Sequence, residues 1–150
     1  MTAYEIFLTA HSYLRWVVLI LAAVTVLKYL IGSVGKKSFT SSDNKISLFY
    51  SIAMDIQLIV GLVLYLFLSP ITNSFHIDMK DTFSRFWGME HIVMMILAVA
   101  FVHIGRVMVK KAKTNSSKFN RGIIYFLLSI IIMLAAIPWP FREMIGRPWF

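Results

Sequence analysis

The sequence predicts an all-α membrane protein, built as an antiparallel up-down-up-down four-helix transmembrane bundle with both termini outside. The residues are 59% hydrophobic and only 15% charged, with a mean hydropathy of +0.75, whereas a soluble domain has about 25% charged residues. Four apolar runs are each long enough to cross a hydrocarbon layer of about 30 Å. The polar segments that join them are short, which forces consecutive helices to be antiparallel neighbours. Residues 1–150 therefore form one domain.

The first predicted span covers residues 6–34 and the second covers residues 46–69. The segment MTAYEIF lacks the basic residues that open a signal peptide, so we expect a retained helix whose N-terminus is outside. Gly32 and Gly35 end this span, and the lysines that follow hold its end inside. The loop SFTSSDN offers Ser, Asp and Asn as N-caps for the second span, which Pro70 stops.

The third predicted span covers residues 87–109 and the fourth covers residues 122–137. An outer loop, which contains His76, precedes the third span, and the polar inner loop AKTNSSKFN separates it from the fourth. Pro138 closes the fourth span. Residues 138–150 interleave Trp and Phe with Arg, a mixture typical of the headgroup region. We expect this tail to lie on the outer surface, as an interfacial anchor or a lid.

The excess of positive charge lies on one side of the predicted bundle, because the basic residues of the other side are mixed with acidic ones. The net charge is +8, and the loops between spans one and two and between spans three and four are rich in lysine. This positive-inside pattern predicts a multi-pass membrane protein whose lysine-rich loops lie on the cytoplasmic side. The basic face then meets anionic headgroups on the cytoplasmic side, and no nucleic-acid partner is expected. The chain has no cysteine, which excludes thiolate metal sites and covalently attached haem.

Two histidines are the leading candidates for a site. His11 lies one or two turns inside the outer end of the first span, and His91 lies at a similar depth in the third span, which runs in the same direction. Neutral imidazole binds haem iron well, and a haem fits between helices of a bundle. Two histidines at one level predict haem ligation, a hydrogen-bonded pair or quinone-type site, or a metal-ion site.

Three further residues are assigned to the same site. Arg15 follows His11 by four residues and shares its face; it could bind haem propionates, extend to the headgroups, or pair with Glu90. Gln57 and Gly61 form a stripe on the second span. Gln57 would hydrogen-bond across the bundle. Gly61 would admit a flat macrocycle, or would simply let two helices pack closely.

A second polar pair is predicted deeper in the membrane. Counted in turns from the outer ends, Asp55 reaches the level of His103, which predicts a buried polar pair or a proton-carrying couple. His103 follows His91 by twelve residues, which is about 18 Å along a helix and turns the side chain about 120° away. That geometry argues against a second haem.

Several motifs resemble those of a known family. The segments LTAHS and QLIVGLVLY, the pair Glu90 and His91, and the closing IPW are similar to those of small four-span bacterial membrane proteins described as cytochrome-b-like. The resemblance implies a b-type cytochrome or an orphan protein of the respiratory membrane. It adds weight to His11, Gln57, Glu90 and His91 and none to His103, and Asp55 falls where some members have His.

The functional expectation is an electron carrier rather than a stand-alone enzyme. One haem b, bound by His11 and His91 near the outer face, would exchange electrons with a quinol or a periplasmic partner. The alternative is a non-haem bundle, acting as an accessory subunit of a larger complex or binding a small molecule or metal. Association with other membrane subunits, or as a homo-oligomer, is compatible with either function.

Overall fold

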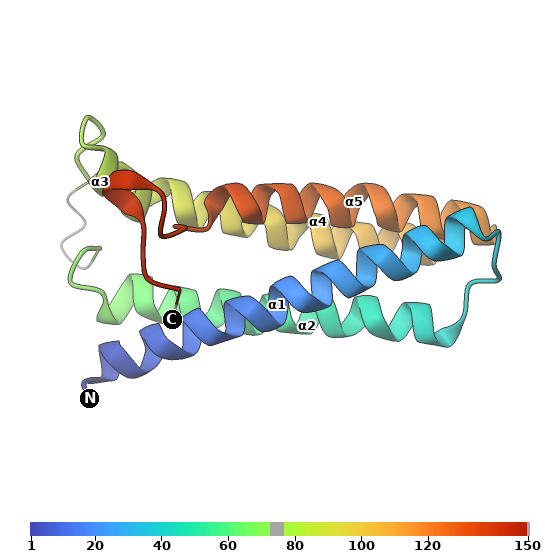
Figure 1. Ribbon diagram of the computed structural model, residues 1–150, viewed down its shortest axis with the longest axis horizontal. Helices are drawn as coiled ribbons and strands as arrows, with labels where there is room; N and C mark the ends of the chain where they lie inside the picture. Colours follow the sequence, from blue (N-terminus) through green and yellow to red (C-terminus); the bar gives the residue numbers. More distant parts are fainter. Residues whose placement is uncertain (73–76, 150) are drawn as a thin grey trace.

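The computed structural model describes residues 1–72 and 77–149, so His76 and Phe150 lie outside the described residues. Four long helical segments run along the molecule, and the N-terminus and the tail lie toward the same end (Figure 1). All four are long and apolar enough to cross a membrane: Ala3–Val34, Ser41–Leu68, Thr82–Lys111 and Asn115–Ala136. The predicted all-helical four-helix bundle is confirmed.

The helices begin earlier than hydropathy predicts, because capping residues set their starts. Helix α1 (Ala3–Val34) begins after Thr2, whose side chain and backbone exchange hydrogen bonds with Glu5. Helix α2 (Ser41–Val63) begins after Thr40, so the Ser, Asp and Asn residues predicted as its caps lie inside its first turn. Helix α5 (Asn115–Ala136) begins after Thr114, so most of the predicted inner loop is helical.

Two helices contain a π-turn at the end of the bundle that holds the N-terminus and the tail, which is called the outer end after its predicted orientation. The turn η1 (Leu64–Leu68) continues α2 up to the stop at Pro70. The third span begins with α3 (Thr82–Arg85), capped by Asp81, passes through the turn η2 (Phe86–Glu90) and continues as α4 (His91–Lys111). The short helix η3 (Glu143–Ile145) lies in the C-terminal tail.

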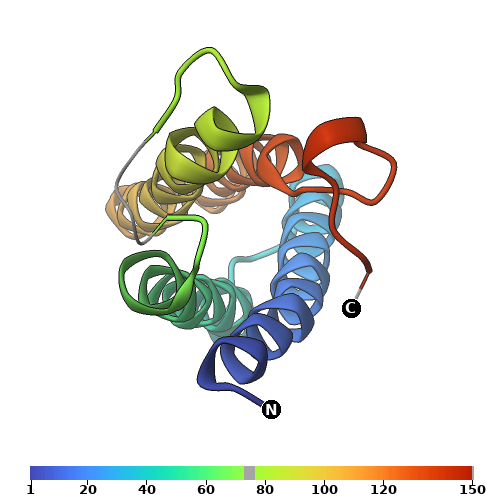
Figure 2. The same cartoon turned by 90° about the vertical axis from the view of Figure 1, so that its left-hand side faces the viewer.

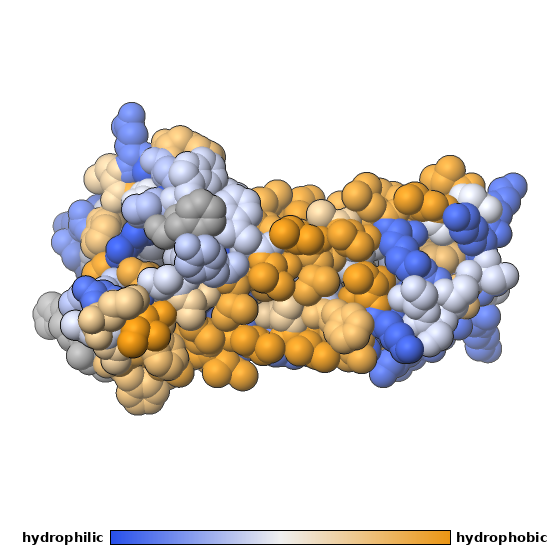
Figure 3. All heavy atoms as spheres, turned by 60° about the horizontal axis from the view of Figure 1, so that its bottom comes forward, coloured by the Kyte–Doolittle hydropathy of each residue, from blue (hydrophilic) through white to orange (hydrophobic). Residues whose placement is uncertain are grey.

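The helices form a ring in the order α1, α2, α4, α5 (Figure 2). Helix α1 therefore lies diagonally opposite α4, and side chains that point inward from these two helices meet across the centre. The bundle surface carries an apolar belt between two more polar ends (Figure 3). This arrangement matches a chain that spans a membrane with its loops in water.

The inner half of the bundle is filled by aromatic side chains. Tyr29, Phe119 and Phe126 are buried, with ring centroids 5.4–5.6 Å from Tyr29 to the other two. The Tyr29 ring packs against Gly122, where a Cβ would come within 2.2 Å of it. Nearer the middle, the Tyr50 and Ser129 hydroxyls are 3.0 Å apart, and Ser129 donates to the Ala98 carbonyl. This close packing contrasts with the outer half of the bundle, which contains a cavity.

Candidate functional site

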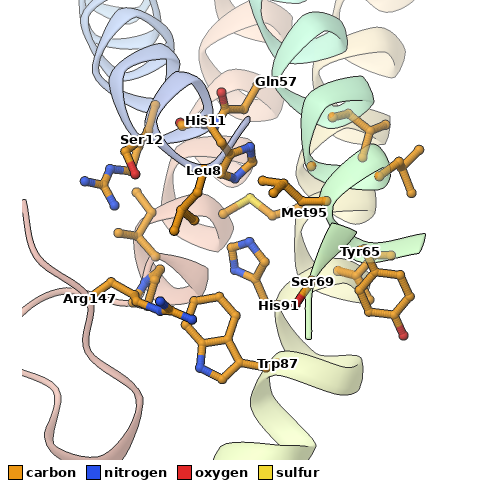
Figure 4. Close-up of a pocket in the computed structure, with 18 of the residues that line it drawn as sticks. Leu8, His11, Ser12, Gln57, Tyr65, Ser69, Trp87, His91, Met95 and Arg147 are labelled. Atoms are coloured by element: carbon orange, nitrogen blue, oxygen red, sulfur yellow. Dashed lines mark hydrogen bonds between the residues drawn. The ribbon is translucent and has the colours of Figure 1, made fainter. Parts of the chain in front are cut away.

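A cavity of about 310 Å³ opens at the outer end of the bundle. Its volume is at the low end of the range for small-molecule sites, about 300–1,000 Å³. All four spans and the tail contribute to its wall (Figure 4). The lining includes every residue that the sequence assigned to the two-histidine site except Glu90: His11, Arg15, Gln57, Gly61 and His91.

The two imidazoles of the cavity come from diagonally opposite helices. His11 projects from α1 and His91 from the start of α4, and both are partly buried. Their ring centroids are 6.4 Å apart, with an angle of 71° between the ring planes. The structure therefore brings the two histidines to one level, as their positions along the first and third spans imply.

The end of α5 fixes the orientation of the His91 ring. Nδ1 of His91 donates to the Ala136 carbonyl at 2.9 Å, since a carbonyl oxygen can only accept. The residue four positions after Ala136 is Pro140, which has no N–H to offer, so this carbonyl is available to the imidazole. The tautomer is set by this bond, and Nε2 keeps the lone pair of the ring.

The His11 ring is held against helix α2. Gln57 Nε2 donates to the His11 carbonyl at 3.0 Å, which is the predicted bond across the bundle. A Cβ on Gly61 would lie 3.0 Å from His11 Cε1. In this structure the group that approaches Gly61 closely is an imidazole, and the expectation of a flat macrocycle near this glycine stays a prediction.

Four buried polar atoms around the cavity have no hydrogen-bond partner among the described residues. They are Nδ1 of His11, Nε of Arg15, Oε1 of Gln57 and Nε1 of Trp87. Buried polar groups are nearly always paired, with protein, water or a ligand. Two of these atoms can only donate and one can only accept. The cavity therefore presents both donors and acceptors to whatever binds there.

Both π-turns border the cavity. Tyr65 in η1 donates to the Gly88 carbonyl in η2, so one hydrogen bond joins the two turns. The Tyr65 carbonyl in turn accepts a hydrogen bond from Thr72. Single π-turns inside α-helices are frequent at functional sites. Residue patterns do not reveal them, because a π-turn has no side-chain signature comparable to a cap.

Arg15 and Glu90 do not pair with each other. Nη2 of Arg15 donates to the Trp149 carbonyl at 2.6 Å, whereas Glu90 Oε1 accepts from Arg85 at 2.6 Å. Of the three roles considered for Arg15, pairing with Glu90 is not the one formed, because the two residues bond to different segments of the chain. Arg15 remains part of the cavity wall, and Glu90 lies outside it.

Trp87 and Arg147 are among the cavity residues that the sequence reasoning missed. The Trp87 ring lies 5.7 Å from the His91 ring, and the Arg147 guanidinium lies 4.8 Å from the Trp87 ring centroid. Trp87 precedes His91 by four residues, so helical spacing could have placed them on one face. No comparable signal existed for Arg147, whose position depends on how the tail folds back.

Asp55 and His103 form the predicted pair but are not buried. His103 Nε2 lies 2.7 Å from Asp55 Oδ1, and the side chains are 50% and 42% exposed, respectively. Both lie on the outward faces of α4 and α2, away from the cavity. Depth along the helix predicted the contact correctly, but counting turns alone gave no information about which way the two side chains face.

Comparison with protein-family models, with curated proteins and with solved structures finds no match for this chain. The site is therefore defined by its geometry: two imidazoles and four unpaired polar atoms around one cavity.

Proposed function

We propose that this protein is a membrane b-type cytochrome that binds one haem b through His11 and His91 near the outer face. It would carry electrons between a quinol and a periplasmic partner in the bacterial inner membrane. The observation that supports this proposal is the pair of imidazoles, from diagonally opposite helices, whose centroids are 6.4 Å apart in one cavity.

The donor set fits a haem iron better than a free metal ion. A ligating imidazole nitrogen lies about 2.0–2.1 Å from its metal, so the rings of His11 and His91, with centroids 6.4 Å apart, are close enough to hold one ion between them. Among residues 1–72 and 77–149, no three His, Cys, Asp or Glu side chains come together at a potential metal site. Two protein ligands are too few for a tetrahedral zinc site, but they suffice for haem.

Other residues of the cavity fit the same group. A ligating histidine usually donates its second ring N–H to a carbonyl or carboxylate, and the bond from His91 to Ala136 has that form. Arg15 and Arg147 bring cationic side chains to the outer end of the cavity, where they would hold the propionates. When bound, haem supplies a one-electron redox couple. The helices around it exclude water and orient the two imidazoles.

The test is the absorption spectrum of the protein produced in a haem-replete bacterium and purified in mild detergent. We expect a Soret band and, by the pyridine haemochrome assay, about one haem b per chain. His11→Ala and His91→Ala should each lose the low-spin spectrum, because each removes one of the two imidazoles that would hold the haem. His103→Ala is the matched control. It removes an imidazole from the same helix at a distance of about 18 Å and should leave the spectrum unchanged.

Two results would overturn the haem assignment. One is a folded, helical wild-type protein without a Soret band. The other is a haem spectrum that persists in the double variant His11→Ala with His91→Ala, because the haem would then be bound elsewhere.

A quinone is the second candidate ligand, and the unpaired donors favour it. Nε of Arg15 and Nε1 of Trp87 are buried without partners and would each donate to a quinone carbonyl. The chain would then act as a non-haem subunit of a larger complex. Organic extraction of the purified protein distinguishes the two ligands, since a quinone without haem supports this second function.

A further inference from the structure

The Asp55–His103 pair faces outward from the bundle at mid-depth in the membrane. Asp55 lies ten residues beyond Lys45, and His103 lies eight residues before Lys111. These separations are about 15 Å and 12 Å along the helices, half the thickness of a hydrocarbon layer of about 30 Å. With 42% and 50% of the side chains exposed, the pair would contact lipid tails in an isolated chain.

Exposure of this pair to lipid is energetically unfavourable. A charged side chain at the centre of a bilayer costs at least about 2.5–3.5 kcal/mol, and pairing across 2.7 Å offsets only part of that cost while half of each side chain faces hydrocarbon. Intramembrane polar residues usually face protein or water. Polar side chains also stabilise contacts between transmembrane helices. The α2–α4 face therefore requires a polar partner.

We infer that this face binds a second copy of the chain around a two-fold axis parallel to the membrane normal. All copies insert with the same orientation, so an axis along the normal preserves the depth of every residue. Asp55 and His103 are already at one depth, because they are in contact. The symmetry therefore brings both pairs to a single level.

The same symmetry makes the polar side chains complementary. Rotation by 180° about an axis through the middle of the face places α2 of one copy opposite α4 of the other. Asp55 of each copy then faces His103 of its partner. Two pairs become a cluster of four side chains with alternating acceptors and donors, enclosed between the two copies and shielded from lipid. A foreign partner would need its own matching residues at this depth, whereas a second copy supplies them by symmetry.

The surface around the pair is suited to close packing. Ile52 and Ile59 flank Asp55 along α2, three and four residues away on the same face, and both are exposed. Ile96 and Val107 flank His103 along α4 in the same way and are also exposed. The face thus has two apolar ridges with a polar centre. Van der Waals packing of the ridges and hydrogen bonding of the centre are the two forces that associate helices in lipid.

Cysteine cross-linking in membranes tests the arrangement directly, because the chain has no cysteine of its own. Ile52 and Val107 lie three and four residues on the inner side of Asp55 and His103. Differently tagged chains that carry Ile52→Cys and Val107→Cys should form a mixed disulfide when they are co-expressed. Leu27→Cys with Val107→Cys is the control. Leu27 follows His11 by the same number of residues as Val107 follows His91, so Leu27 and Val107 lie at a similar depth. Leu27 is 57% exposed, but it lies on α1 and not on the proposed interface. We expect about tenfold more cross-linking from the first pair than from the control.

Charge variants test the central cluster without disturbing the cavity. Asp55→Asn should weaken dimerisation in detergent or liposomes by roughly threefold to tenfold for each cross-pair. Combining Asp55→His with His103→Asp should restore dimerisation, since the swapped residues still face each other across the axis. Thermal melting of each variant checks that the bundle is intact.

Three results would overturn the inference. The first is cross-linking of Ile52→Cys and Val107→Cys no greater than that of the control, and the second is unchanged dimerisation by Asp55→Asn. The third is a cross-link from Ile52→Cys to a different protein in native membranes, which would make that protein the partner of the face.

Discussion

Gly61 and Gly122 each face an aromatic ring, but their surroundings differ. A Cβ at position 61 would lie 3.0 Å from His11 Cε1, beside the cavity, into which the imidazole can yield. A Cβ at position 122 would lie 2.2 Å from Tyr29 Cε1, and the Tyr29 ring is fully buried. The first glycine therefore sets the geometry of the site, and the second sets the packing of the core.

This contrast predicts opposite effects for two alanine substitutions. Gly122→Ala should lower the free energy of unfolding by about 1–3 kcal/mol, because the buried ring has nowhere to move. Gly61→Ala should change the free energy of unfolding little, since the higher helix propensity of Ala, about 1 kcal/mol, offsets a small shift of the imidazole. It should instead reduce the haem content of the purified protein. Denaturant unfolding in detergent and haem stoichiometry measure the two effects, and the reverse ranking would contradict this assignment.

The sequence is informative about the site only where regular helices carry its residues. Depth along two parallel spans brought His11 and His91 together, and four-residue spacing put Gln57 and Gly61 on one face. The directions of the Asp55 and His103 side chains could not be predicted in this way, because they depend on how the neighbouring helices pack. Arg147 reaches the cavity through the path of an irregular tail, which helical periodicity does not describe. Local periodicity therefore gave the level of each group but not the direction of every side chain.

Among the elements, helix starts depart most from the predicted boundaries. Hydropathy detects the part of a helix that contacts lipid, whereas a helix continues into water until a cap ends it. Asp43 illustrates this in the first turn of α2. Its carboxylate accepts two hydrogen bonds from Thr40, each 2.7 Å long, and lies 3.3 Å from Lys28 of α1. The Asp43 side chain thus stabilises the first turn of α2 through Thr40 and links α2 to α1 through Lys28.

Substitutions at Asp43 should separate these two contributions. Asp43→Asn keeps an acceptor for Thr40 but loses the ion pair with Lys28, whose side chain is 37% exposed, so we expect a loss of no more than about 1 kcal/mol. Asp43→Ala also removes both hydrogen bonds that the N-cap residue Thr40 donates to this side chain, so we expect a total loss of about 2 kcal/mol. Unfolding in detergent, followed by circular dichroism, measures both. Equal losses for the two variants would mean that the cap contributes nothing.

At the scale of the whole molecule, charge and hydropathy are arranged along the bundle axis. Four apolar helices form the belt between the polar ends (Figure 3). The lysines of both inner connections gather at the end opposite the N-terminus, because α1 and α4 run parallel. Composition and charge distribution were sufficient to predict this architecture, since few other folds bury every backbone polar group in lipid.

The orientation of the bundle in the membrane remains a prediction, and accessibility labelling tests it. Ala3→Cys and Ser116→Cys are exposed positions at opposite ends of the bundle. A membrane-impermeant maleimide should label Ala3→Cys in intact cells, but should label Ser116→Cys only after lysis, because the lysine-rich end stays in the cytoplasm. A cysteine-free parent is the control for background. The opposite labelling pattern would invert the proposed topology.

The contact between the tail and α1 bears on how the protein is made. The Trp149 carbonyl accepts hydrogen bonds from Arg15 and from Trp16 Nε1, so residues separated by more than 130 positions meet at the mouth of the cavity. A ribosome synthesises Trp149 after every helix that forms the cavity wall. The tail can therefore complete the wall of the cavity only after all four membrane-spanning helices have been made.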